Sequence, residues 1–276
     1  MIGVFDSGYG GLTVFSEIKK RLPRYDYLYL GDNARAPYGT RSFEVVYSYT
    51  WQAVDFLFRQ GCTLVILACN TASAKALRQI QQVNLLQVWK QDGNTCRRVL
   101  GVIRPTVEVV GNYTRSRHIG IFATAGTVAS NSYPIELSHL YPDLHVTQQS
   151  CPLWVPIIEA GEHRDEGADW FVRKYTRQLL QADPLIDTVL LGCTHYPLLM
   201  EKIQKYAGDN VRLVAQGTIV AESLQDYLLR HPEIECTCSK GGTTNYLTTE
   251  SADKFMASAG VFLSEPVQAT HIELEK

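Results

Sequence analysis

Several features are missing from this 276-residue sequence, and each absence narrows the class of protein. No apolar stretch reaches the roughly 18 residues of a transmembrane helix, and the start, MIGVFDSGYGG, lacks the basic segment of a signal peptide. The net charge is only −2, which gives no basic surface for nucleic acid or an acidic membrane. The seven cysteines are odd in number and have no framework spacing, as in reduced cytosolic proteins. We therefore expect a cytoplasmic protein that binds neither nucleic acid nor membranes.

What is present is an alternation of short apolar runs and amphipathic stretches. Hydrophobic residues make up 45% of the sequence and charged residues 20%, values typical of a globular enzyme. The expected strands are 2–5, 27–30, 64–68, 99–103, 119–122, 144–148, 188–191 and 212–215. The expected helices are 13–21, 43–59, 72–82, 128–140, 166–181, 198–206 and 219–229. Because the strands are rich in β-forming residues without a polar alternation, and because they alternate with helices, we predict an α/β fold with mainly parallel sheets covered on both faces.

Ligands of such sheets bind at the carboxyl ends of the strands, so we expect the functional residues in the loops that follow the strands. Three of them are unusual: DSGYGG (6–11), GDNARAPYGTRS (31–42) and CNTAS (69–73). The second half of the chain repeats part of this plan. IGIFATAGTVAS, from residue 119, aligns without gaps on IGVFDSGYGGLT, from residue 2, and LLGCTHYPLL resembles VILACNTASA. We predict two similar α/β domains related by a pseudo-two-fold axis, with the active site in the cleft between them.

This arrangement would bring Cys69 and Cys193 to opposite sides of one cleft, where two thiols can invert a carbon centre. One group removes a proton from one face while the other returns a proton to the opposite face. A free thiol has a pKa of about 8.5, so a neighbour need only favour the anion or relay its proton. Asp6 ends the first strand and His195 lies two residues after Cys193, so both are candidates for that role.

Each of these assignments has a structural alternative. A cysteine that ends a strand is more often inert packing, although two at matched positions of a repeat favour chemistry. Asp6 could only cap the helix that follows it, and His195 could be a structural histidine. Cys236-x-Cys238 could be half of a metal site, but no second ligand pair has suitable spacing. Cys193-x-His195 could likewise bind a metal, but its position after an apolar strand and its pairing with Cys69 argue against this.

The rest of the cleft is predicted to hold a small anion without a cofactor. Ser7, Gly8, Gly10 and Gly11 offer a hydroxyl and backbone N–H groups at a helix start. Further hydrogen-bonding groups come from Asn70, Thr71, Thr124, Thr127 and Thr194. No basic residue is an obvious carboxylate clamp. The sequence contains no P-loop and no convincing dinucleotide-binding motif, since DSGYGG lacks the acidic residue expected about 20 positions later.

The chain resembles the glutamate racemases of the aspartate/glutamate racemase superfamily. The segments that carry the resemblance run from residue 5 to about 255 and are FDSGYGGLTV, GDNARAPYGTRS, ACNTASA, ATAGTVASNSY, CPLWVPIIEAG, GCTHYPLL and YLTTESADKF. Aspartate-type relatives usually carry an acidic residue in place of His195. The resemblance implies a homodimer that interconverts L- and D-glutamate without cofactor or metal and supplies D-glutamate for peptidoglycan.

The resemblance also assigns roles to residues. It implies that Cys69, assisted by Asp6, removes the α-proton from D-glutamate, and that Cys193, assisted by His195, removes it from L-glutamate. The residues that it implies for substrate binding are Ser7, Tyr38, Gly39, Asn70, Thr71, Thr124, Thr127 and Thr194, with Glu159 near the substrate amino group. It divides the chain into a first domain of about 1–98 with 213–276 and a second of about 99–212.

Two segments depart from the family pattern, and two other functions stay open. VAQGTIVA replaces an expected aspartate-serine-glycine pattern, which we expect not to alter the chemistry, and residues 89–98 are longer and more polar than usual. One alternative function is racemisation of another acidic amino acid such as aspartate, or a one-base decarboxylation. The other is a non-catalytic, two-lobed amino-acid sensor, against which the retention of both cysteines argues.

Overall fold

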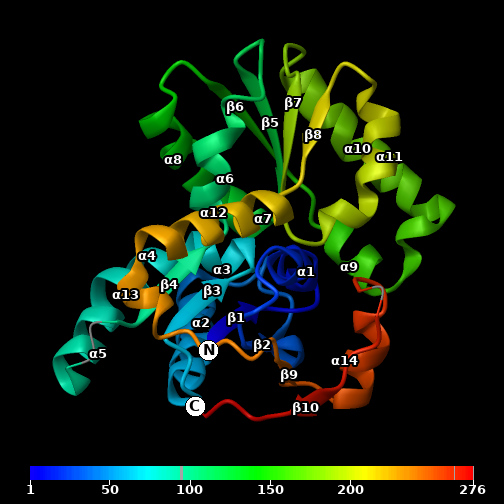
Figure 1. Cartoon of the computed structure of the whole chain (residues 1–276). Helices are drawn as coiled ribbons and strands as arrows, with labels where there is room; N and C mark the ends of the chain where they lie inside the picture. The colour runs from blue at the N-terminus through cyan, green and yellow to red at the C-terminus, as the bar shows by residue number, and fades with distance from the viewer. Residues whose placement is uncertain (94–95, 264, 276) are drawn as a thin grey trace.

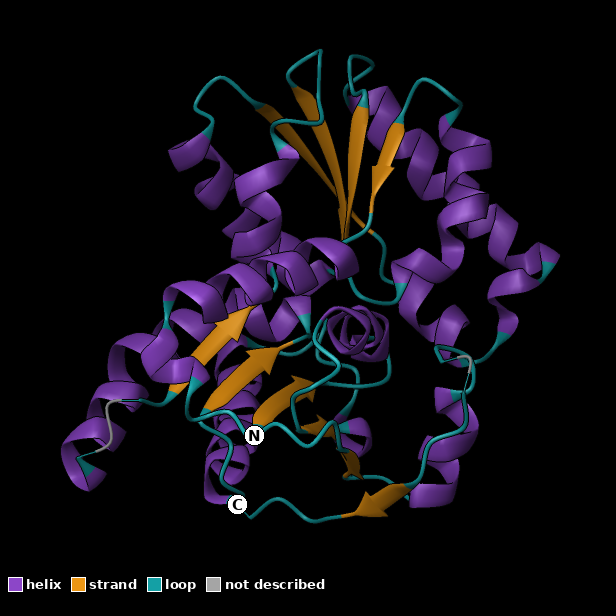
Figure 2. Cartoon of the chain, viewed as in Figure 1, coloured by secondary structure: helices purple, strands orange, loops and turns teal. Residues whose placement is uncertain are grey.

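The computed structural model describes residues 1–93, 96–263 and 265–275, and they form two β-sheets surrounded by helices (Figures 1 and 2). The first sheet has the strand order β10 (Ala269–His271), β9 (Thr244–Thr248), β2 (Tyr27–Gly31), β1 (Ile2–Asp6), β3 (Leu64–Leu67) and β4 (Arg98–Gly101). The second has the order β6 (His145–Ser150), β5 (His118–Ala123), β7 (Thr188–Gly192) and β8 (Arg212–Val214). All paired strands are parallel, which confirms the predicted α/β class.

Helices connect successive strands and cover both sheets (Figure 2). Those of the first sheet are α1 (Gly11–Arg21), α2 (Phe43–Arg59), α3 (Asn70–Lys75), α4 (Leu77–Gln79), α5 (Leu85–Asp92), α12 (Gly217–Arg230), α13 (Pro232–Glu235) and α14 (Ala252–Ala259). Those of the second are α6 (Ile103–Val110), α7 (Ala125–Ser130), α8 (Ser132–Leu140), α9 (Trp154–Glu159), α10 (Glu166–Ala182) and α11 (Met200–Ala207). In the described part of the chain, no helix is both long and apolar enough to cross a lipid bilayer.

The order of strands repeats between the two sheets, as the predicted duplication requires. The order β2-β1-β3-β4 in the first sheet corresponds to β6-β5-β7-β8 in the second. Cys69 follows β3 and Cys193 follows β7, so the two cysteines occupy equivalent places in the two halves. The strands β1 and β3 pair directly, which places Asp6 beside the chain that leads to Cys69.

The chain crosses between the sheets twice. β4 pairs with β3 over its whole length, so the first crossing lies after Gly101, and β8 pairs with β7, so the return lies after Val214. On this basis we propose a first domain of 1–101 with 215–276 and a second of 102–214, a few residues beyond the expected boundaries at 98 and 212. After the return, α12 runs between the two sheets and packs against α1 (Figure 1).

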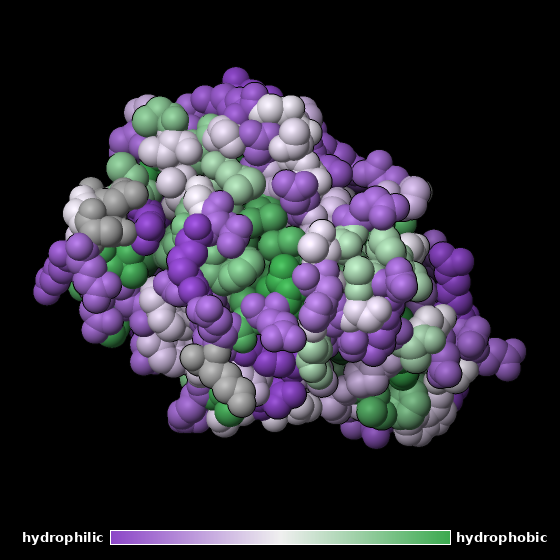
Figure 3. Space-filling model, turned by 90° about the horizontal axis from the view of Figure 1, so that it is seen from below, coloured by the Kyte–Doolittle hydropathy of each residue, from purple (hydrophilic) through white to green (hydrophobic). Residues whose placement is uncertain are grey.

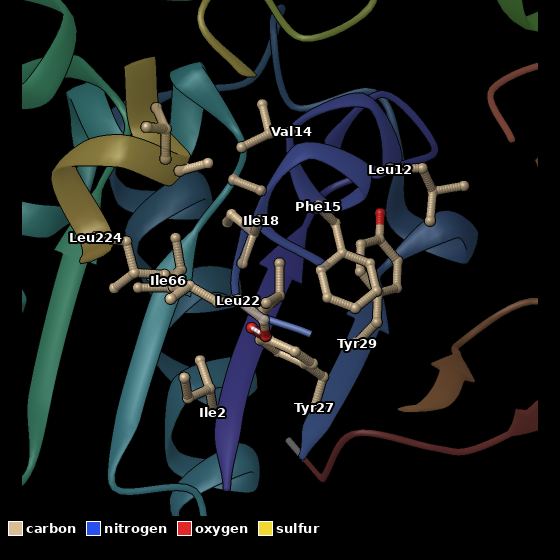
Figure 4. Packing of buried hydrophobic residues seen from close by; sticks show 14 of the residues in the cluster. Ile2, Leu12, Val14, Phe15, Ile18, Leu22, Tyr27, Tyr29, Ile66 and Leu224 are labelled. Atoms are coloured by element: carbon tan, nitrogen blue, oxygen red, sulfur yellow. Dashed lines mark hydrogen bonds between the residues drawn. The ribbon is translucent and has the colours of Figure 1, made fainter. Parts of the chain in front are cut away.

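The apolar strands of the first sheet bury side chains on both faces. Alternate residues such as Tyr27 and Tyr29 face one core cluster, while Leu28 and Leu30 face the other. Figure 4 shows the rings of Tyr27 and Tyr29 beside Phe15 of α1. This double burial explains why the strands show no polar alternation. On the face seen from below, hydrophobic residues gather near the centre and are surrounded by hydrophilic ones (Figure 3).

All eight expected strands are present, but β9, β10 and several short helices, among them α6, α9 and α14, were not predicted. The expected helix 128–140 is wrong as one element, because Asn131 has a positive φ of 55° and separates α7 from α8. The expected helix 72–82 is divided between α3, α4 and the start of a π-helical segment, Ile80–Asn84. Of the polar segment 89–98, α5 ends at Asp92, and residues 94–95 lie outside the described residues.

Candidate active site

A small pocket lies between the two domains, at the carboxyl ends of strands from both sheets. It encloses about 370 Å³ of empty space, part of it open to solvent, which restricts it to a small ligand. Its lining residues are Asp6, Ser7, Gly8, Ala36, Pro37, Tyr38, Cys69, Asn70, Thr71, Thr124, Val155, Glu159, Cys193, Thr194 and His195. Most of the predicted site residues are therefore in one place. None of these described lining residues is a lysine or an arginine.

The glycine-rich loop after β1 serves Asp6 rather than an external anion. The backbone N–H of Gly8 donates to Oδ2 of Asp6 at 3.0 Å, and that of Gly11 also donates to this carboxylate. The expected use of these two N–H groups for a ligand is therefore wrong. Asp6 is buried, and burial raises the pKa of its carboxyl despite these hydrogen bonds and the opposing charge of His195. Its Oδ1 has no hydrogen-bond partner among the described residues.

Gly10 lies against His195, which belongs to the other domain. A Cβ atom at this position would lie 2.2 Å from Nδ1 of His195 and 2.5 Å from Oγ1 of Thr194. Only a residue without a side chain permits this approach. Next to it, the hydroxyl of Thr13 donates to the carbonyl of Thr194 at 2.8 Å, which fastens the start of α1 to the second domain.

Cys69 stands at the N-cap of α3, directly beyond β3. Its sulfur accepts a hydrogen bond from the backbone N–H of Ala72 at 3.4 Å and lies 3.1 Å from the hydroxyl oxygen of Ser7. Burial and the nearby charge of Asp6 raise the pKa of the thiol to about 12, although the contacts with Ser7 and Ala72 lower it. With this pKa, Cys69 carries its proton at neutral pH, which is the form of a proton donor.

Cys193 is the first member of a chain of three side chains. Its sulfur lies 3.8 Å from Nδ1 of His195, and Nε2 of His195 lies 2.9 Å from Oε1 of Glu159. Burial by itself lowers the pKa of His195, but the contacts with Cys193 and Glu159 raise it to about 10. His195 is therefore an imidazolium at neutral pH. The position of Glu159 as a partner of His195, rather than only of a ligand, was not predicted from the sequence.

Threonines join the two domains beside the pocket. Oγ1 of Thr71 lies 3.0 Å from Oγ1 of Thr124 and 3.4 Å from Oγ1 of Thr127. Thr127 is fully buried behind the pocket and does not line it. Gly39 is not among the lining residues either, and its carbonyl accepts a hydrogen bond at 2.7 Å from the backbone N–H of Gly126 across the domain boundary. Both residues lie beside the pocket lining, and their predicted contact with a ligand stays a prediction.

Tyr38 lines the pocket with its ring, since its hydroxyl is engaged elsewhere. That hydroxyl donates to the buried carboxylate of Asp32, which also accepts hydrogen bonds from Arg35 and Thr249. Burial and the charge of Asp32 hold the pKa of Tyr38 well above its usual value. Asp32 was missed by sequence reasoning, although its position directly after β2 could have identified it. Val155 on α9 was missed as well, because nothing in its local sequence marks it.

Within the described residues, no group of three or more His, Cys, Asp or Glu side chains is arranged to hold a metal ion. Asn70 offers the pocket a different kind of group, a buried amide nitrogen Nδ2 without a partner among the described residues.

Comparison with known proteins supports the family that the motifs suggested. The sequence profile of the Asp/Glu/Hydantoin racemase family matches residues 2–224. A glutamate racemase of Ruegeria sp. is 40% identical, over 96% of this chain and 97% of its own. The crystal structure of a glutamate racemase from Francisella tularensis in complex with D-glutamate is 30% identical, with a TM-score of 0.86 over 99% of this chain and 97% of the other. That of a glutamate racemase isoform from Bacillus anthracis is 34% identical, with a TM-score of 0.83 over the same shares. The chain therefore belongs to the Asp/Glu/Hydantoin racemase family and is an isomerase of the amino-acid racemase class.

Proposed function

We propose that this chain interconverts L- and D-glutamate by a two-base mechanism in which Cys69 and Cys193 are the catalytic residues. The observation that carries the proposal is that these two thiols come from equivalent strands of the two domains and line the same small pocket. Each would approach the α-carbon of a bound amino acid from its own domain. The names of the relatives supply the choice of glutamate.

In the direction from L- to D-glutamate, the thiolate of Cys193 removes the α-proton and the thiol of Cys69 donates a proton to the opposite face. The raised pKa of Cys69 suits the second role, since a thiol with a pKa of about 12 carries its proton at neutral pH. After one turnover Cys69 is the thiolate and Cys193 the thiol, so the enzyme is ready for the reverse reaction. Return to the first state requires proton exchange with neighbouring groups or water.

His195 and Asp6 are placed to handle those protons. The imidazolium of His195, held by Glu159, stabilises a thiolate at Cys193 and can exchange its Nδ1 proton with that sulfur. On the other side, the raised pKa of Asp6 allows this carboxyl to hold a proton transiently near Cys69. Ser7 is the hydroxyl in contact with the Cys69 sulfur and is placed to orient the thiol.

Neutral donors would hold the substrate in place of an arginine. We assign the carboxylates of glutamate to hydroxyls and amides of the pocket, among them Asn70, Thr71 and Thr194, and the amino group to the neighbourhood of Glu159. The proposal extends to a homodimer in the cytoplasm that supplies D-glutamate for peptidoglycan, as the resemblance implies. The proposed reaction needs no cofactor, since the two thiols carry out both proton transfers.

The test is isotope exchange and optical inversion with matched cysteine variants. L-Glutamate incubated with the enzyme in D2O should lose optical activity, which circular dichroism measures. It should also gain deuterium at Cα, which proton NMR measures. Cys69→Ser and Cys193→Ser should each reduce racemisation by about three orders of magnitude or more, because each thiol is needed in both directions. Cys236→Ser, at an exposed cysteine, is the matched control and should retain the wild-type rate.

Three outcomes would reject parts of the proposal. Unlabelled and uninverted glutamate after long incubation would reject the activity. Inversion of aspartate alone would reject the substrate. Unchanged binding and unchanged activities in both pocket variants would favour the amino-acid sensor over the enzyme.

A further inference from the structure

We propose that Gln216 and Tyr133 are positioning residues that fix the orientation of the Asn70 amide and thereby make Asn70 a hydrogen-bond donor to substrate. This inference rests on the proposed function only in assigning a carboxylate of glutamate as the group that Asn70 meets. Gln216 lies in VAQGTIVA, the stretch that departs from the family pattern, and is separated from the pocket by Tyr133.

A continuous chain of buried hydrogen bonds joins these residues. The amide nitrogen Nε2 of Gln216 lies 2.9 Å from the hydroxyl of Tyr133, and that hydroxyl lies 2.6 Å from Oδ1 of Asn70. At its other end, Nε2 of Gln216 lies 2.8 Å from Oγ1 of Thr106 and 3.2 Å from the carbonyl oxygen of Val102. Gln216, Tyr133 and Asn70 are each at most 3% exposed, so water does not compete for these contacts.

The carbonyl of Val102 sets the direction of every bond in the chain. A backbone carbonyl can only accept, so the amide group that faces it must be the NH2 of Gln216 and not its oxygen. The second hydrogen of this NH2 then goes to the Tyr133 oxygen, which leaves the Tyr133 proton for Oδ1 of Asn70. The hydroxyl of Thr106 donates to the same Val102 carbonyl at 2.9 Å. The Gln216 hydrogen that faces this carbonyl is therefore shared between it and Oγ1 of Thr106.

The consequence appears at the pocket. Because Oδ1 of Asn70 accepts from Tyr133, its Nδ2 must point the other way, where it has no partner among the described residues. Asn70 lines the pocket. A buried NH2 group without a protein partner is available there to donate a hydrogen bond to a ligand. A carboxylate oxygen satisfies it. If the Asn70 amide had the opposite orientation, its Oδ1 would face the carboxylate and repel it.

The chain also spans both domain crossings. Val102 and Thr106 belong to the start of α6, just after the first crossing, and Gln216 precedes α12, just after the second. Tyr133 lies on α8 of the second domain, whereas Asn70 begins α3 of the first. The orientation of a group in the pocket is thus set by residues at the junction of the domains. Sequence spacing alone does not bring these residues together.

The test uses two substitutions of similar size at Gln216. In Gln216→Glu the introduced carboxylate can only accept, so it takes the Tyr133 proton, and Asn70 must turn its NH2 towards Tyr133 and its oxygen towards substrate. We expect KM for both enantiomers of glutamate at pH 8 to rise about ten- to hundredfold, the cost of one hydrogen bond to a charged group, with kcat within about threefold. Gln216→Met neither donates nor accepts, so Tyr133 still donates to Asn70, and KM should stay within about threefold.

Tyr133→Phe distinguishes a positioning role of Gln216 from a purely structural one. In a Tyr133→Phe background, Gln216→Glu should raise KM no further, because its effect travels through the Tyr133 hydroxyl. In protein labelled with ¹⁵N-asparagine, the Asn70 side-chain amide signal should shift in Gln216→Glu and remain unchanged in Gln216→Met. This signal needs no substrate. If wild-type protein fails to racemise glutamate, the proposed function is rejected. The amide signal still tests the direction of the hydrogen bonds that join Gln216, Tyr133 and Asn70.

Several results would overturn the inference. They are equal KM changes in Gln216→Glu and Gln216→Met, an additive effect of Gln216→Glu in the Tyr133→Phe background, or an Asn70 amide signal that does not respond to Gln216→Glu. If Gln216→Glu does not fold, Tyr133→Phe alone decides. It leaves Oδ1 of Asn70 without its donor and should raise KM at least several-fold, and an unchanged KM would refute the wiring.

Discussion

Glu159 should control the charge of His195, and Glu159→Gln isolates that control. The substitution keeps the length of the side chain and its oxygen but removes the negative charge that lies 2.9 Å from Nε2 of His195. Both side chains are mostly enclosed, with 7% of the His195 side chain and 24% of the Glu159 side chain exposed, so solvent screens the pair only in part. The loss of charge should therefore be felt strongly at the imidazole.

The expected magnitude follows from the contacts. In the wild-type protein the contacts with Cys193 and Glu159 outweigh burial and hold the pKa of His195 at about 10. Removal of an opposite charge at this distance lowers a pKa by about one to three pH units, so the pKa of His195 should fall to between about 7 and 9. With a pKa of about 8, only roughly a quarter of His195 would be protonated at pH 8.5, against about 97% in the wild type.

The same change alters stability in a defined pH window. The pKa of His195 is raised on folding from an unfolded value of about 6.5, so its protonation stabilises the folded state fully below pH 6.5. That contribution is lost as the pH rises through about 10. Loss of the Glu159 charge should remove about 1.4–4 kcal/mol of it at pH 6 and progressively less towards pH 10.

NMR titration of ¹⁵N-histidine-labelled protein measures the pKa of His195, and urea unfolding between pH 6 and 10 measures the stability difference. Glu162→Gln is the matched control, because Glu162 is exposed and only three residues away. It should leave both measurements unchanged. The reasoning is refuted if His195 titrates near pH 6.5 in the wild type, or if Glu159→Gln and Glu162→Gln have the same titration curve.

Two further substitutions test the fit of the site and of the core. Gly10→Ala should reduce racemisation at least a hundredfold, because its methyl group would displace the ring of His195, whereas Gly167→Ala, which meets nothing within 4 Å, should retain the wild-type rate. Phe15→Ala should lower the free energy of unfolding by about 3–5 kcal/mol in urea titrations, since the ring is fully buried, while Leu185→Ala, at a residue 61% exposed, should change it by no more than about 0.5 kcal/mol.

Local patterns were sufficient for the elements that are buried on both faces. The runs around Val4, Ile66 and Leu190 are predominantly apolar, and each became a fully buried central strand. The edge strand β10 was missed, because its residues Ala269–His271 are mostly exposed and carry no apolar signal. The break at Asn131 was missed as well, since a single left-handed residue inside a helical pattern changes the hydrophobic period too little to be recognised.

The sequence by itself determined which groups reach the pocket, because a strand that ends in Cys-Asn-Thr or Cys-Thr-His delivers those side chains to the carboxyl edge of its sheet. It also determined the repeat, and with it the equivalence of Cys69 and Cys193. Only the tertiary structure decided which groups are partners. Glu159 reaches His195 and Tyr133 reaches Asn70 across many residues of chain, and such contacts depend on how two domains pack, which no local pattern encodes.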